Sequence, residues 1–126
     1  DTLMAILPVI SKALVGLTVY PDKMEAAIDS TMMATDLADY LVMLGIPFRE
    51  AHALVAQTVR IAYQKNKSMK ELTLTEYRSI HPDFDEMVYH VFDPRVSIAR
   101  RKAIGGTAPE AVIQQVRDAK QVLEQQ

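Results

Sequence analysis

The hydrophobic positions of residues 32–66 have the spacing of two consecutive helices that meet at Gly45. In the first helix, the apolar residues that recur every three or four positions are Leu37, Leu41 and Leu44. They share one face of a helix. Tyr40 is expected beside this face, and Asp36 and Asp39 are expected away from it. Gly45 follows the last apolar position, where a left-handed residue can end a helix at little steric cost.

The second helix begins near Pro47, which suits a first helical turn because its missing N–H would have no partner there. Its apolar stripe is predicted to comprise Phe48, Ala51, Val55, Val59 and Ala62. The solvent side is marked by Arg49, Glu50, Gln57 and Arg60. Two such amphipathic helices cannot bury each other's apolar faces alone, so the remaining segments are expected to pack against them.

Residues 2–20 are apolar on nearly every side of a predicted helix, with interruptions at Pro8, Ser11, Lys12 and Gly16. These interruptions disfavour a membrane span, which needs about 20 apolar residues. A signal peptide is disfavoured because no basic leader or small-residue cleavage site is present. We therefore expect a helix buried in a larger core. Its own chain should cover one side, and another subunit or further chain the other. Pro8 predicts either a kink or a helix that begins near it.

The rest of the chain reads as short helices over about residues 22–29, 74–80, 84–91, 94–102 and 109–123. Residues 67–71 are expected to form a polar connection. His81-Pro82 should end the helix over residues 74–80. In the last helix the apolar positions are Val112, Val116, Ala119 and Leu123. Val96 and Ile98 are expected to point inward. Because no segment alternates long enough to form a strand, the predicted fold class is all-α.

Several helix starts carry capping residues. Thr73 with Glu76, and Thr107 with Glu110, have the spacing of capping boxes, in which each residue's side chain bonds the other's backbone N–H. Asp93 precedes Pro94, a pattern typical of an N-cap followed by proline in the first turn. Residues 29–32 are also rich in capping side chains.

Composition narrows the class of protein. The 126 residues suffice for one domain, and 49% hydrophobic and 24% charged residues are typical of a globular protein. A net charge of −2 and a pI near 5.9 disfavour nucleic-acid binding. The one basic run, residues 100–102, is interpreted as a solvated face. No cysteine is present, which excludes disulfides and thiolate metal sites.

The residue types that carry chemistry form no recognisable site. The histidines are His52, His81 and His90, and none has the spacing of a metal-ligand pair. The acidic residues 83–86 lack the glycine and length of a calcium loop and predict a helix start instead. Ser97 has no identifiable partner base. Residues 105–107 favour a tight turn, with anion binding as the alternative. Met32 and Met33 are interpreted as core filler. We therefore assign no catalytic, cofactor-binding or metal residue.

Three blocks together resemble the C-terminal part of argininosuccinate lyase, a member of the fumarase/aspartase superfamily that includes δ-crystallin. They are ATDLADYL at 34–41, GIPFREAH at 45–52 and GGTAPE at 105–110. The stretch VFDPRVSIARRKAIGG, residues 91–106, is similar to the family's approach to the same glycine pair. The resemblance extends over essentially the whole chain, with matching order and spacing.

The resemblance implies a cytoplasmic enzyme of arginine biosynthesis that cleaves argininosuccinate to arginine and fumarate by β-elimination. A general base removes a proton while an acid assists the departing amine. The family needs no metal or organic cofactor. Its members are homotetramers whose central helices form one bundle and whose active sites combine residues from three subunits. Residues 1–19 would end one central-bundle helix, and residues 20–126 would be the helical C-terminal domain.

The resemblance also implies that the catalytic part is elsewhere. The family's glycine-serine-serine loop, followed by methionine, proline, lysine and asparagine, is absent from this sequence. We therefore transfer no catalytic residue to any position and expect the chain alone to be inactive. Two alternatives stay open. One is a free-standing helical interaction module that binds a partner through residues 2–19. The other is a superfamily lyase acting on adenylosuccinate or a related fumaryl compound.

Overall fold

The computed structural model describes residues 1–125, which contain helices and no strand, so the all-α prediction is confirmed. The α-helices are α1 (Thr2–Val15), α2 (Pro21–Ala26), α3 (Ala34–Met43), α4 (Phe48–Gln64), α5 (Leu74–Ile80), α6 (Pro94–Ala99) and α7 (Pro109–Glu124). Three short 3₁₀-helices lie between them: η1 (Ser30–Met33), η2 (Met69–Glu71) and η3 (Glu86–Phe92).

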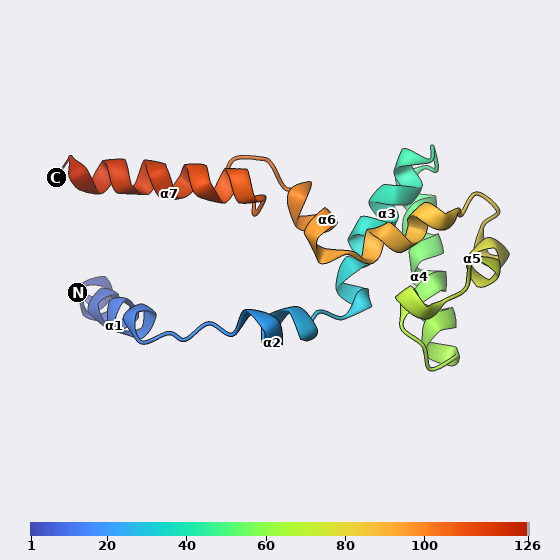
Figure 1. The fold of residues 1–126 in the computed structure, drawn as a ribbon, viewed down its shortest axis with the longest axis horizontal. Helices are drawn as coiled ribbons and strands as arrows, with labels where there is room; N and C mark the ends of the chain where they lie inside the picture. The colour runs from blue at the N-terminus through green and yellow to red at the C-terminus, as the bar shows by residue number, and fades with distance from the viewer. Residues whose placement is uncertain (126) are drawn as a thin grey trace.

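The core is organised around the predicted hairpin of α3 and α4, with η3 and α5 packed on it (Figure 1). Gly45 joins the two helices in the left-handed conformation, with φ +94°. The Ile46 N–H donates to the Leu41 carbonyl oxygen at 3.1 Å and closes the turn. Large side chains buried in this core include Leu37, Leu41, Tyr77, Phe84 and Val88. The hairpin prediction is confirmed in position and in turn residue, and the leucine face is confirmed at Leu37 and Leu41 but not at Leu44, which is exposed.

Tyr77 is the largest fully buried side chain among the described residues, and it connects α5 with η2. Its hydroxyl donates to the Met69 carbonyl oxygen at 2.7 Å, and its ring centroid lies 4.9 Å from that of Phe84. Burial raises the pKa of Tyr77. Met69 is itself 1% exposed and belongs to η2, so the prediction of a polar connection over residues 67–71 is wrong. One buried methionine in a polar stretch is too weak a signal for periodicity to detect.

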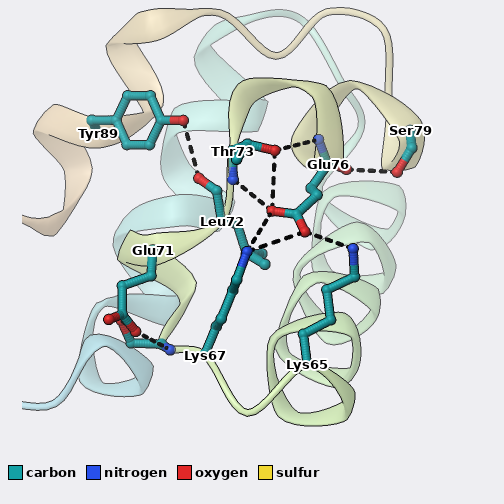
Figure 2. Close-up of polar contacts among 9 residues, drawn as sticks. Lys65, Lys67, Glu71, Leu72, Thr73, Glu76, Ser79 and Tyr89 are labelled. Atoms are coloured by element: carbon teal, nitrogen blue, oxygen red, sulfur yellow. Dashed lines mark hydrogen bonds and ion pairs between the residues drawn. The ribbon is translucent and has the colours of Figure 1, made fainter.

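The carboxylate of Glu76 joins the start of α5 to the end of α4 (Figure 2). It accepts hydrogen bonds from Lys65 Nζ at 2.6 Å and from the Thr73 N–H at 2.6 Å, and Lys67 Nζ lies 3.4 Å away. Thr73 Oγ1 accepts from the Glu76 N–H, which confirms the predicted capping box. Bonding to Lys65 first, and to the Thr73 backbone next, lowers the pKa of Glu76 to about 2. A second capping box, at Ser68, had not been predicted.

Two helical arms, α1 and α7, extend from the core toward the same end of the molecule (Figure 1). No residue of either helix is buried. The expectation that the chain covers one side of α1 is therefore wrong, because the connection through residues 16–33 carries α1 away from the core. α1 runs as one helix through Pro8, so it does not begin there. Among the described residues, no helix is long and apolar enough to cross a membrane.

Five side-chain placements differ from the sequence predictions. Leu44, expected on the apolar face, is 39% exposed at the end of α3. Asp36, expected away from the core face, is 4% exposed because α6 and the chain after it cover that side of α3. Phe48 is 64% exposed because it stands at the first turn of α4, beyond the edge of the core. Ile98, expected to point inward, is 41% exposed, on the last turn of short α6. Met32 is 66% exposed, whereas Met33 fills the core as predicted.

The predicted capping box at Thr107 does not form. The residue that precedes α7 is Ala108, with φ −58° and ψ 140°, and Pro109 occupies the first turn. Proline holds the residue before it in an extended conformation, so the helix begins after Ala108. Thr107 is then one position too early to reach the N–H that an N-cap side chain bonds. The caps predicted at Asp29 and Asp93 do form, through the N–H groups of Thr31 and Arg95.

The Glu76 contacts predict a pH-dependent contribution to stability. Because the pKa of Glu76 is about 2 when folded and near 4.5 in the reference state, its ionised form favours the fold. The contribution is complete above pH 4.5 and is lost as pH falls through 2. Glu76→Gln should therefore lower the free energy of unfolding at pH 7, and the deficit should shrink between pH 4.5 and 2.

Urea unfolding followed by far-UV circular dichroism, at several pH values, measures this deficit. Glu50→Gln, on the exposed face of α4, is the control and should leave stability nearly unchanged throughout. A Glu76→Gln deficit that stays constant down to pH 2 would show that the ionised carboxylate does not stabilise the fold.

Candidate functional site

The histidines lie on different elements of the described part of the chain. No group of three or more His, Asp or Glu side chains is placed to hold a metal ion there. His52 lies on α4 against the exposed ring of Phe48, and His90 lies in η3. His81 follows α5, with Nδ1 3.8 Å from Asp83 Oδ2. The three histidines therefore lie on different elements, as their positions in the sequence indicate.

The acidic stretch at residues 83–86 starts a helix, as predicted. Asp85 Oδ1 accepts from the Met87 N–H at 2.8 Å and also from the Tyr40 hydroxyl at 2.9 Å. The second bond connects α3 with η3. Burial, opposed in part by a hydrogen bond from the Asp85 backbone, raises the pKa of Tyr40. Both groups therefore serve to hold the core together.

Asp36 is the one carboxylate that is nearly removed from solvent among the described residues. Its Oδ2 accepts from Ser97 Oγ at 2.9 Å, and its Oδ1 accepts from Arg101 Nη2 at 3.0 Å. The Arg101 side chain is 42% exposed, and its Nη1 lies 4.0 Å from Asp39 Oδ2. Burial of a carboxylate is favourable only when its oxygens are bonded in this way. The cluster therefore anchors α6 and the chain after it to α3.

A tight elbow, residues 101–108, follows this anchor and leads into α7. The Arg101 carbonyl oxygen accepts from the Ala108 N–H at 3.1 Å, and the Ala103 carbonyl oxygen accepts from the Gly106 N–H at 2.8 Å. Gly105 has φ +81°, a conformation that side chains rarely adopt. A Cβ at Gly106 would lie 2.1 Å from the Arg101 carbonyl oxygen, so only glycine fits. The elbow is therefore a defined turn with a strict sequence requirement.

The surroundings of the elbow favour the tight-turn interpretation of residues 105–107 over anion binding. A hollow of about 410 Å³ lies beside the elbow and the first turns of α7. Its lining includes two carboxylates, Glu110 and Asp118, and one cation, Lys102. Lys102 Nζ is paired with Glu110 Oε1 at 3.2 Å. An anion in this hollow would meet more negative than positive side chains.

The surface that stands out is apolar and lies on the two arms. On α1 the exposed residues are Leu3, Met4, Ile6, Leu7, Val9, Ile10, Leu14 and Val15. On α7 they are Val112, Ile113, Val116, Val122 and Leu123. Exposed apolar surface of this extent marks a site for binding other protein. The arms are therefore the candidate functional site, and the elbow and the Asp36 cluster position one of them.

Sequence reasoning missed the Asp36 cluster. Asp36 and Arg101 are far apart in the chain, and no local spacing connects them. Arg101 was interpreted as part of a solvated basic run. Its side chain is in fact only 42% exposed, because its guanidinium is bonded to Asp36. The one usable signal was that Asp36 directly precedes Leu37, a core residue of α3.

Comparison with known proteins identifies relatives of the whole chain. The family model described as argininosuccinate lyase C-terminal matches residues 31–99. The argininosuccinate lyase of Chloroflexus aggregans is 47% identical over 123 residues, which are 98% of this chain and 27% of that protein. The argininosuccinate lyase of a Roseiflexus species is 45% identical over 99% of this chain and 28% of its own length.

A eukaryotic relative shows the same pattern. The probable argininosuccinate lyase of Schizosaccharomyces pombe is 37% identical over 98% of this chain and 27% of its own length. The chain thus spans about a quarter of the length of the curated relatives it matches.

Asp36→Asn tests the anchor. The substitution removes the charge that holds Arg101 and keeps the side-chain shape. It should lower the free energy of unfolding by about 1.5–3 kcal/mol, the range for a hydrogen bond to a charged group. Asp39→Asn, whose carboxylate is half exposed and 4.0 Å from Arg101, should change it by less than about 0.5 kcal/mol. Urea denaturation measures both, and equal effects would show that burial of Asp36 adds nothing.

Proposed function

The chain belongs to the argininosuccinate lyase C-terminal family, whose model covers more than half of it, and from this premise we propose that it is the C-terminal part of an argininosuccinate lyase. The complete enzyme would be a carbon–nitrogen lyase that cleaves argininosuccinate to arginine and fumarate by β-elimination in the cytoplasm. In this proposal it uses no metal or organic cofactor and assembles from identical subunits as a homotetramer.

The observation that carries the proposal is the uncovered apolar surface of α1. The helix is apolar on almost every side, and none of its residues is buried by the chain itself. A helix of this kind is stable only inside a larger core. A lyase about four times as long as this chain would supply that core, since the matched relatives extend well beyond the aligned region. Residues 1–19 then end a central-bundle helix, and residues 20–126 form the domain after it.

The role of this chain within the enzyme would be structural support. The polar side chains with defined partners, among them Asp36, Asp85 and Glu76, are engaged in holding helices together. Asp85 lines a hollow of about 220 Å³ with His90 and Arg100, but its Oδ1 already accepts from the Tyr40 hydroxyl and the Met87 N–H. Catalytic groups would come from the remainder of the lyase, so we propose that the chain alone releases no fumarate.

A chimeric enzyme tests the proposal. The aligned C-terminal quarter of the Chloroflexus aggregans lyase is replaced by this chain, and fumarate release from argininosuccinate is followed by ultraviolet absorbance. The chimera should be active, whereas the truncated Chloroflexus enzyme and the isolated 126-residue chain should both be inactive. A folded chimera without activity would favour the free-standing interaction module. Activity on adenylosuccinate in place of argininosuccinate would favour another lyase of the superfamily.

A further inference from the structure

The elbow fixes the direction of a helix that its own chain leaves uncovered. No residue of α7 is buried, yet the chain leading into it is anchored by Asp36 and Arg101. It then turns through Gly105, at φ +81°, and Gly106, where a Cβ would meet the Arg101 carbonyl oxygen. Such a turn restricts α7 to one direction. Restricting an element in advance lowers the entropy lost when it binds. The elbow should therefore lower the entropy that α7 loses when it binds another part of a protein.

The apolar side of α7 is a single stripe. Val112 is 44% exposed, Val116 49% and Leu123 70%, and with Ala119 they share one face of the helix. The opposite face is polar, where Gln114 Nε2 donates to Asp118 Oδ1 at 2.7 Å. A one-sided helix needs one apolar neighbour, unlike α1, which needs neighbours all round.

We propose that the α7 stripe docks on the part of the lyase polypeptide that precedes Asp1. This inference rests on the proposed function. Most of the length of the matched relatives lies outside the aligned region, which leaves ample chain to cover α7. The start of α1 and the end of α7 lie at the same end of the molecule, away from the core (Figure 1). Chain that enters α1 therefore arrives on the side where α7 extends. α7 is then a second attachment of the domain, held at a fixed angle by the elbow.

Site-specific thiol labelling tests this docking, because the chain has no cysteine of its own. In the chimera described above, Val116→Cys places a thiol on the stripe and Gln114→Cys places one on the opposite face. Maleimide labelling at each position is quantified by peptide mass spectrometry and compared with the urea-unfolded chimera. The thiol at position 116 should react at least about tenfold more slowly than when unfolded, and the thiol at 114 nearly as fast.

The elbow is tested in the same chimera by Gly106→Ala, which places a Cβ against the Arg101 carbonyl oxygen. Labelling at position 116 should then approach the unfolded rate. Retained protection would contradict the positioning role of the elbow.

The outcomes separate the two proposals. An active chimera in which both thiols react equally fast overturns the docking of α7 and leaves the proposed function intact. A chimera that releases no fumarate overturns the proposed function, and the docking falls with it.

Discussion

Uncovered apolar surface is the constraint on which the behaviour of this chain depends. α1 presents apolar side chains in every direction, and α7 presents a stripe along its length. Each Å² of such surface left in water forgoes about 25 cal/mol of stabilisation. The arms therefore gain far more from association than any single polar contact in the core contributes. This is why membership in a longer lyase explains the chain better than an independent existence does.

The core from which both arms extend (Figure 1) has its buried polar groups paired. Within the described residues, every buried side-chain nitrogen and oxygen has a hydrogen-bond partner. Its polar contacts join elements that are distant in the chain: Tyr40 to Asp85, and Asp36 to Arg101. Such bonds hold helices at fixed positions relative to one another. The core thereby presents two helices, α1 and α7, that it does not itself cover.

Most helices could be predicted because apolar spacing and capping residues lie close together in the sequence. Side-chain placements that depend on residues distant in the sequence could not be predicted. The burial of Leu37 and Leu41 on α3, the turn at Gly45 and the capping box at Thr73 follow from spacing over a few residues, and all three are confirmed. The burial of Asp36 depends on α6 packing beside α3, which no local pattern encodes. Of the candidate site, the apolar character of α1 was readable from composition alone. A tight turn was predicted at residues 105–107, but not its closure by the Ala108 N–H on the Arg101 carbonyl oxygen.

The association state of the isolated chain tests the central claim most directly. Sedimentation velocity over a range of concentrations, paired with hydrogen exchange of residues 2–15, reports whether α1 finds cover and whether it is helical. We expect the isolated chain to self-associate in a concentration-dependent way, and removal of residues 1–19 to abolish this association. A monomer at all concentrations, with α1 protected from exchange, would contradict it, because the helix would then be stable without any neighbouring chain.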